Sequence, residues 1–435
     1  MPNTKNGAPA PKSNLNSNPA SKPVRKKKTN KAANPLLIWF FIPVLCLGMI
    51  INLVWPERAY SSVENRPLAH IPSITSNGVS TGSWMKDVTT WFSDQLVGRN
   101  MFFHTNYLIQ KAAGDKEIDD VFLGSRSLIG QPKKPDDAVW NKNLQGITLL
   151  ANNAELPSTI MIVPGSAQVQ PNKLPANAPV NLQEKLFEAL PGMEDIYVTP
   201  VDVRGILQGH QGEYIYYNTD HHWTSLGAGF AAEEFFAGRE EEMSLQDFNS
   251  YQVSSSFQGT YASKTGSVGL SDDIFIYTAK ADPLYTVKAG DSLTTTIYDK
   301  SALERKDQYE LFLGRNQALV QIETTSTELG KHLLLFKDSY ANAFVQFLLP
   351  YYRTITIVDP RYFYDDIDLI LSSYSISEVL YLFSSDNFAT DASLSNVLDT
   401  YENGLYPAEE EQDGDSSESA DESLKEQEES ELVTP

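Results

Sequence analysis

Five short segments that alternate with helical patterns constrain the fold of this chain more than any other feature. Residues 333–336 form a continuous apolar run, which is typical of a strand buried on both faces of a sheet. Strands joined by helical crossovers run parallel. The sequence therefore predicts an α/β fold in which a parallel sheet is flanked by helices. The other strand segments are 158–163, 196–203, 353–358 and 379–383, and the helical patterns are 182–190, 225–237, 340–349 and 365–372.

The segment from about residue 247 to 326 interrupts this alternation. It is rich in Ser, Thr, Tyr and Gly, and its short alternating runs at 273–277 and 294–298 predict antiparallel hairpins. We therefore predict a β-rich insertion within one domain that spans residues 136–402. We expect the insertion to overhang the ligand cleft, where its tyrosines are either platforms for sugar rings or ordinary sheet residues.

One stretch combines a carboxylate, two of the six histidines and a tryptophan in four consecutive positions, Asp220-His221-His222-Trp223. If this stretch is extended, side chains alternate faces, so Asp220 and His222 point the same way and His221 points oppositely. That geometry couples one carboxylate to one imidazole. Such a pair supplies the base and its orienting group in a nucleophilic triad.

A metal site is the alternative interpretation of this stretch, because aspartate and histidine are both metal ligands. On an extended segment, however, neighbouring histidines point apart, which disfavours joint coordination. The remaining histidines, at positions 70, 104, 210 and 332, show no ligand spacing. We therefore predict neither a metal nor another cofactor.

A candidate nucleophile, Ser339, lies in the predicted turn between strand 333–336 and helix 340–349. The free amides at the helix N-terminus, near Tyr340, would stabilise an oxyanion. Taken alone, Ser339 is better explained as a helix N-cap, but its pairing with Asp220 and His222 favours a nucleophile. Ser166 follows strand 158–163, so it either borders the ligand crevice or belongs to a plain turn.

The string at residues 220–223 resembles the signature of the DHHW protein family of Gram-positive bacteria. The resemblance covers most of residues 60–390, because other motifs follow in the family's order. The family is similar to the periplasmic alginate O-acetyltransferases, which are SGNH-hydrolase-like and carry an Asp-x-His-Trp motif before the serine. The additional motifs are Glu64-Asn65-Arg66, Asp94 with Gly98-Arg99, Phe312-Leu313-Gly314-Arg315-Asn316, Lys337-Asp338-Ser339-Tyr340-Ala341-Asn342 and Asp359-Pro360-Arg361-Tyr362.

This resemblance implies an SGNH-hydrolase-like fold in which Ser339 is the nucleophile, His222 the base and Asp220 the carboxylate that orients it. It also implies oxyanion-hole roles for Gly314 and Asn316, although the family commonly has a second glycine where this chain has arginine. Other motif residues are expected to support the site: His221, Trp223 and Asp338.

The beginning of the chain predicts a membrane anchor. Residues 1–33 contain eight Lys and Arg and no acidic residue, and they lack apolar periodicity, so we predict a disordered cytoplasmic tail. Residues 36–55 are uncharged and largely apolar, enough to cross a bilayer, and no cleavage pattern follows them. We therefore assign 34–56 to a retained transmembrane signal anchor, with the remainder outside the cell. Residues 57–135 show helical periodicity and predict a helical lead-in.

The rest of the chain is acidic, and the net charge of the whole chain is −22. Residues 403–435 predict an acidic disordered tail, and the acidic balance argues against nucleic acid as a partner. The only cysteine, Cys46, lies within the predicted anchor. The extracellular part therefore has no internal disulfide, cysteine metal site or thiol nucleophile.

These observations predict a membrane-anchored extracellular serine O-acyltransferase, with acetyl as the expected group, that modifies a cell-surface or cell-wall polysaccharide. The acyl donor would be delivered across the membrane by a partner protein. A carbohydrate esterase would use the same three residues with water as the acceptor. The third interpretation is a non-enzymatic cell-envelope protein that keeps a decayed site.

Overall fold

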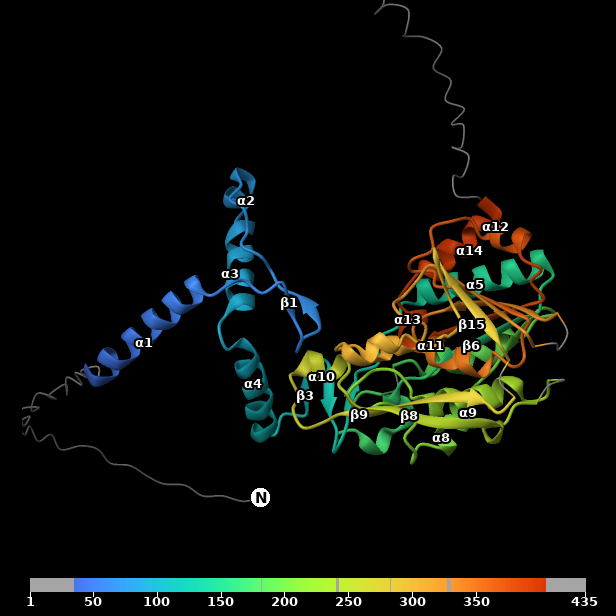
Figure 1. Cartoon of the computed structure of the whole chain (residues 1–435), viewed down its shortest axis with the longest axis horizontal. Helices are drawn as coiled ribbons and strands as arrows, with labels where there is room; N and C mark the ends of the chain where they lie inside the picture. The colour runs from blue at the N-terminus through green and yellow to red at the C-terminus, as the bar shows by residue number, and fades with distance from the viewer. Residues whose placement is uncertain (1–34, 181, 240–241, 282, 327–329, 404–435) are drawn as a thin grey trace, which may run out of the picture. The chain divides into compact units, whose positions relative to one another are not determined.

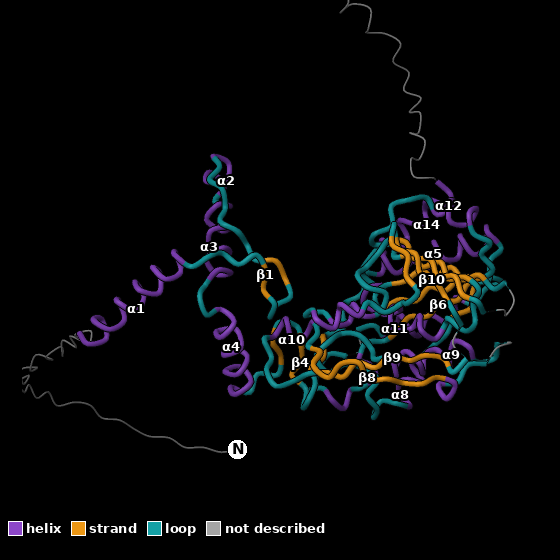
Figure 2. Tube along the Cα trace, viewed as in Figure 1, coloured by secondary structure: helices purple, strands orange, loops and turns teal. Residues whose placement is uncertain are grey.

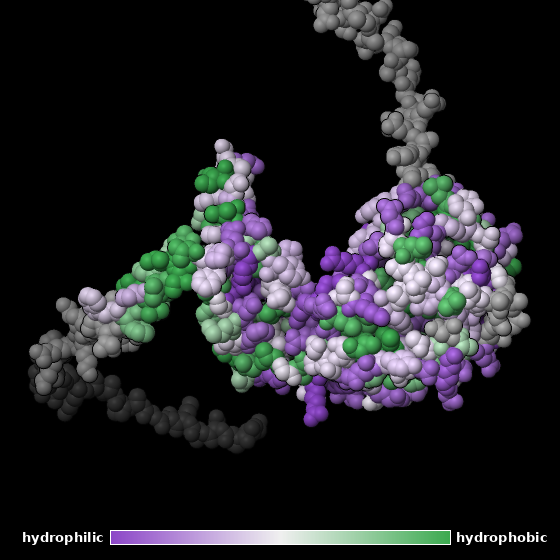
Figure 3. All heavy atoms as spheres, viewed as in Figure 1, coloured by the Kyte–Doolittle hydropathy of each residue, from purple (hydrophilic) through white to green (hydrophobic). Residues whose placement is uncertain are grey.

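The computed structural model describes residues 35–180, 182–239, 242–281, 283–326 and 330–403, and it divides the chain into two units, residues 1–57 and 58–435. In the first unit, α1 (Pro35–Val54) exposes large apolar side chains from Trp39 onwards (Figure 3). No helix in the described part of the chain is both long enough and apolar enough to span a membrane. The predicted transmembrane helix is therefore not supported. The predicted basic tail, 1–33, and residues 404–435 of the acidic tail lie outside the described residues.

The second unit is built around an eight-stranded sheet (Figures 1 and 2). Its last five strands in spatial order are neighbours that pair in parallel, in agreement with the five segments found in the sequence. In spatial order the strands are β11 (Ser292–Thr294), β10 (Tyr285–Ala289), β12 (Leu319–Thr324), β14 (Thr354–Val358), β13 (His332–Lys337), β15 (Glu378–Ser384), β6 (Ser158–Val163) and β7 (Val198–Pro200).

The sheet is mixed, which corrects the prediction of a purely parallel sheet. β12 pairs antiparallel with both β14 and β10, so part of the predicted insertion extends the main sheet and does not overhang a cleft. The physical reason is burial, because Val320 and Ile322 of β12 pack into the core of the sheet. The remaining insertion strands, β8 (Phe248–Phe257) and β9 (Asp272–Ala279), form a separate antiparallel pair, and the run 294–298 is not one strand because β11 ends at Thr294.

Helices cover both faces of the sheet. On β13, Leu333 and Leu335 enter one core, whereas Leu334 and Phe336 enter the other, as strand periodicity requires. The first core is covered by α8 (Arg204–Gly209), α9 (Ser225–Phe236) and α11 (Tyr340–Phe344). The second core is covered by α5 (Asp137–Ala154), α7 (Glu184–Ala189), α12 (Ile367–Ser373) and α14 (Ser393–Asn403).

The segment after residue 57 contains more than the predicted helices. A pair of two-residue strands, β1 (Tyr60–Ser61) and β2 (Arg66–Pro67), comes first. The helices α2 (Ser76–Thr81), α3 (Ser83–Gln95) and α4 (Arg99–Ala113) follow. A three-stranded sheet then follows, formed by β3 (Glu117–Ile118), β4 (Val121–Leu123) and β5 (Leu128–Gly130). Its strands form because Val121 and Leu128 bury their side chains against Ala262.

Short helices connect these elements. They are α6 (Ser166–Val169), α10 (Thr260–Thr265) and α13 (Ser385–Phe388), together with the 3-10 helices η1 (Pro171–Lys173), η2 (Leu190–Met193), η3 (Leu245–Asp247), η4 (Lys300–Glu304), η5 (Gln308–Leu311) and η6 (Val345–Phe347).

Candidate active site

Ser339 lies between β13 and α11, at the carboxyl end of a central parallel strand. The neighbouring carboxylate, Asp338, fixes this turn and is completely buried. Its Oδ1 accepts the Tyr340 amide at 2.9 Å, and its Oδ2 accepts the amide and the hydroxyl of Ser384 at 2.9 and 2.7 Å. The side-chain amide of Asn387 donates to the same Oδ2 at 2.8 Å. Asp338 therefore ties the turn that carries Ser339 to the end of β15.

We predict a large loss of stability when Asp338 is replaced by alanine. The change leaves several buried donors without an acceptor, which is expected to lower the free energy of unfolding by about 3 kcal/mol or more. Denaturant unfolding followed by tryptophan fluorescence measures the loss. Asp87→Ala, an exposed change on α3, serves as the control and should stay within about 0.5 kcal/mol of the wild type. Equal stability of both variants would contradict the role given to Asp338.

Three predicted site residues form one continuous hydrogen-bonded chain. Asp220 Oδ1 lies 2.6 Å from His222 Nδ1, and His222 Nε2 lies 2.8 Å from the Ser339 hydroxyl. Because the carboxylate accepts the proton on Nδ1, Nε2 is the nitrogen that accepts from serine. Asp220 and His222 are 3 % and 5 % exposed, so water does not compete for these bonds.

The backbone of residues 220–222 is bent, which corrects the prediction of an extended segment. Asp220 Oδ1 also accepts the backbone amide of His222 at 3.0 Å, and this local bond turns the chain. As a result His221 does not point away: its ring lies 3.8 Å from the ring of His222 and its Nδ1 lies 3.5 Å from Asp220 Oδ1.

Residues of the predicted insertion fix the position of Asp220. The amide of Thr260, at the start of α10, donates to Asp220 Oδ2 at 2.7 Å. Gly259 allows this approach, because a β-carbon at that position would lie 2.3 Å from the Asp220 side chain. Asp272 of β9 accepts the backbone amides of Asn218 and Thr219, each at 2.7 Å. These contacts join segments far apart in the sequence, and no local pattern singles them out.

Tyr309, in η5, is a site residue that the sequence analysis missed. Its ring stacks on the His222 ring with centroids 3.7 Å apart and planes 9° apart. Its hydroxyl donates to the backbone carbonyl of Ser339 at 3.0 Å. Tyr309 therefore fixes both the imidazole and the serine turn. As one of 21 tyrosines in a segment without clear periodicity, it gave no distinguishing signal.

Electrostatics keep the imidazole of His222 neutral. Burial and the neighbouring His221 lower the pKa of His222 to about 4, against the opposing influence of Asp220. Burial acts to raise the pKa of Asp220, but the two imidazoles outweigh it and hold this pKa well below its usual range. Asp220 is therefore ionised and His222 is able to accept a proton.

The bend also brings together the ligand atoms of a candidate metal site. Possible ligand atoms of Asp220, His221 and His222 lie within 4.8 Å of one another. The prediction that the two histidines point apart is therefore wrong. Both nitrogens of His222 are nevertheless engaged, one with Asp220 and the other with Ser339. In this arrangement His222 has no free lone pair to offer a metal ion.

The two aromatic residues of the motifs pack the site together. Trp223 is fully buried, and its indole N–H donates to the Tyr340 carbonyl at 2.8 Å. The Tyr340 hydroxyl donates to the His221 carbonyl. The Tyr340 amide, predicted to stabilise an oxyanion, is already bonded to Asp338 Oδ1 and is not free for that role.

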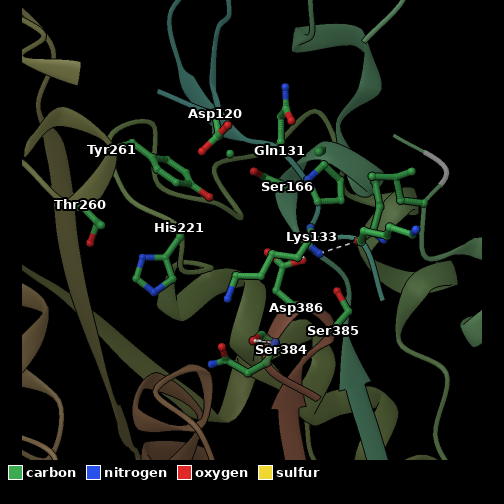
Figure 4. A pocket seen from close by; sticks show the side chains of 18 of the residues that line it. Asp120, Gln131, Lys133, Ser166, His221, Thr260, Tyr261, Ser384, Ser385 and Asp386 are labelled. Carbon is green, nitrogen blue, oxygen red and sulfur yellow. Dashed lines mark hydrogen bonds between the residues drawn. The ribbon is translucent and has the colours of Figure 1, made fainter. Parts of the chain in front are cut away.

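A cleft of about 530 Å³ opens beside the hydrogen-bonded chain (Figure 4). His221 and Tyr340, the sequence neighbours of His222 and Ser339, line it, and so does Ser166. Gly314 and Asn316 are not among its lining residues. Asn316 is exposed, with its side-chain nitrogen 3.5 Å from the Tyr362 hydroxyl, and the implied oxyanion roles of these two residues stay predictions.

Comparison with known proteins agrees with the resemblance drawn from the motifs. The family model described as DHHW protein matches residues 189–358, which confirms the prediction of a likeness to that family. A DHHW family protein from Eubacterium siraeum has a similar structure, with 22 % identity, a TM-score of 0.53 and coverage of 63 % of this chain and 93 % of the other. PatB1 of Bacillus cereus, solved with a sulfonyl adduct, is 17 % identical, with a TM-score of 0.54 and coverage of 63 % and 99 %. None of the curated proteins matches the chain.

Proposed function

We propose that this protein is a serine O-acyltransferase, with acetyl as the transferred group, that acts on a polysaccharide hydroxyl. The observation that carries the proposal is the unbroken hydrogen-bonded chain from Asp220 through His222 to Ser339. This arrangement matches the geometric requirement for a nucleophile, its base and the orienting carboxylate. The likeness to the DHHW family, and through the Asp-x-His-Trp motif to alginate O-acetyltransferases, favours acetyl as the group.

The reaction has two halves. In the first, His222 Nε2 takes the Ser339 proton while Oγ attacks the acyl carbonyl, and the protonated His222 then gives this proton to the departing group of the donor. In the second, His222 takes the proton of a sugar hydroxyl, whose oxygen attacks the acyl-serine and displaces Ser339, which regains its proton. Water in place of the sugar makes the same site an esterase.

The negative charge that develops on the acyl oxygen must be stabilised by a hydrogen-bond donor. We assign this role to the backbone amide of Ser339, which donates no hydrogen bond within the described residues. Amides placed at the developing oxyanion are a large part of catalysis by serine nucleophiles. Asp338 keeps this amide in place because it fixes the neighbouring Tyr340 amide and the end of β15.

Tyr309 is expected to act as a positioning residue. Tyr309→Phe keeps the stacking on His222 but loses the bond to the Ser339 carbonyl, so we expect kcat to fall about tenfold. Tyr309→Ala loses both contacts and should lower kcat by about 100-fold or more, because the base loses its orientation. Turnover of p-nitrophenyl acetate measures both effects. Equal losses in the two variants would contradict a role for the stacking.

Activity is expected to persist to unusually low pH. His222 acts as a base only when neutral, and its pKa is lowered from 6.5 to about 4, so kcat/KM should hold from pH 7 to 5 and fall below about pH 4. Because the folded pKa lies below the unfolded one, stability also declines as the pH falls through this window, and circular dichroism must show that the protein stays folded. An acid limb of kcat/KM near pH 6.5 would contradict the assignment.

One experiment separates transfer from hydrolysis. The full chain in detergent is incubated with an activated acetyl ester, with and without cell-wall glycans, and mass spectrometry follows both acetate release and glycan mass. Gain of acetyl groups by a glycan, absent in Ser339→Ala, supports transfer. Acetate release that no glycan alters makes the protein an esterase. An intact chain without turnover, and with a Ser339 that does not react with a fluorophosphonate, leaves the non-enzymatic interpretation.

We also propose that residues 34–56 anchor the protein with its second unit outside the cell, where glycan acceptors are found. The proposal rests on the sequence, because an uncharged apolar run follows a strongly basic segment. Delivery of the acyl donor would then fall to a membrane partner that carries it across the bilayer. Protease added to intact protoplasts should digest the second unit, and protection of this unit would contradict the orientation.

A further inference from the structure

We propose that the cleft beside His221 recognises an anionic group on the acceptor glycan, a carboxylate or a phosphate, through Lys133 and Lys134. The inference rests on the proposed function, because it names the chemical class of acceptor for the same site. The volume of the cleft, about 530 Å³, falls in the range of small-ligand sites and suits one or two sugar units.

The position of the two lysines supports this assignment. Lys133 and Lys134 follow β5 in the chain and line the cleft together with His221. Figure 4 shows Lys133 reaching into the cleft from the side opposite His221. Among the ion pairs of the described residues, neither lysine has a carboxylate partner. An anion bound here would therefore pair with ammonium groups that make no competing ion pair.

The other charged groups of the cleft leave a positive excess. Lys264 and Asp120 lie 3.4 Å apart and largely cancel each other. Asp386 Oδ1 accepts hydrogen bonds from the Lys133 amide at 2.9 Å and from the side-chain amide of Gln183 at 2.6 Å, and this carboxylate remains as one negative charge. Lys133 and Lys134 thus outnumber the one remaining carboxylate.

This local excess stands out against the net charge of −22 for the whole chain. An excess of positive charge among the lining side chains, here three lysines against two aspartates, attracts anionic ligands, and the effect weakens as salt rises. Tyr261, which is partly exposed, also lines the cleft and offers a flat apolar surface on which a sugar ring packs. The combination fits an acidic sugar unit better than a neutral one.

The test measures binding to the full-length Ser339→Ala variant in detergent, so that no chemistry intervenes. Two matched pairs of probes are titrated calorimetrically: a uronic acid oligosaccharide with its carboxyl-reduced form, and a glycan bearing glycerol phosphate with its dephosphorylated form. We expect at least one anionic member to bind about tenfold more tightly than its neutral partner, with a difference that shrinks in high salt. The pair that shows the difference identifies the anion as carboxylate or phosphate.

Introducing both Lys133→Ala and Lys134→Ala into the Ser339→Ala variant should remove its preference for the anionic probe. Lys288→Ala, an exposed change on β10 outside the cleft, is the matched control and should keep it. Equal affinity within each pair, absence of binding by all four probes, or a preference that survives loss of both lysines would overturn the inference. Labelling of Ser339 by a fluorophosphonate in the otherwise unchanged chain tests the proposed function separately, so the two failures are distinguishable.

Discussion

Ser339→Ala is expected to lower turnover of an activated acetyl ester by about 10⁶-fold, which is the size of effect seen when a serine hydrolase loses its triad nucleophile. The hydroxyl removed is the group that bonds His222 Nε2 at 2.8 Å, and no cysteine in the second unit can replace it. His222→Ala should cause a loss of similar size, because the serine then has no base. Initial rates with p-nitrophenyl acetate measure both variants.

Two control variants separate this result from general damage. Ser372→Ala removes an exposed serine of α12, and His210→Ala removes a histidine whose partner is Glu213 on the surface. Both variants should keep turnover within about threefold of the wild type. If Ser339→Ala retained more than one-tenth of the wild-type turnover while folded, the nucleophile would have to be another group.

Asp220→Asn is expected to lower kcat by about 10⁴-fold and to lower stability by about 1–3 kcal/mol, because the His222 backbone amide loses its acceptor, Oδ1. An asparagine side chain can keep the contact with the Thr260 amide through its oxygen, but its nitrogen then faces His222 Nδ1. That nitrogen donates to Nδ1 and places the imidazole proton on Nε2, which can no longer accept from Ser339. The measurement is kcat for the same ester, together with the thermal unfolding temperature.

His221→Ala provides the contrast for this prediction. His221 lies beside the chain of hydrogen bonds, 3.8 Å from the His222 ring, but it bonds neither Ser339 nor His222. We expect it to change kcat for the small ester far less than Asp220→Asn does. Losses of equal size in the two variants, combined with inhibition by chelators, would favour a metal site formed by Asp220, His221 and His222.

Much of the fold followed from local sequence patterns. The apolar run 333–336 gave β13 and, with it, the position of Ser339 at a strand end. The side of the sheet on which each residue lies also followed, because strand periodicity is local. The antiparallel strands β10 and β12, which extend the sheet beyond β14, did not follow. Their alternating residues are equally compatible with a free hairpin and with strands added to an existing sheet.

The candidate site was predictable in its members and less so in its geometry. Asp220 and His222 pair, but through a bend that an aspartate side chain makes with the amide two residues later. The same kind of bond engages the Tyr340 amide, because Asp338 Oδ1 accepts it from two residues before. An aspartate two positions before the residue whose amide it accepts is a sequence signal for the bends at Asp220 and at Asp338. Tyr309, Gly259 and Asp272 reach the site only through the tertiary fold, and local patterns carry no information about them.

The most direct test of the account is to find where the acyl group goes. The full chain is mixed with p-nitrophenyl acetate, quenched in acid and digested with trypsin, which cleaves after Lys337 and after Arg353 and so isolates Ser339 on one short peptide. Fragment-ion mass spectrometry should locate one acetyl group on Ser339 in the wild type and none there in His222→Ala. Turnover of the ester without acetyl on Ser339, or acetyl on a different side chain that depends on His222, would contradict the proposed mechanism.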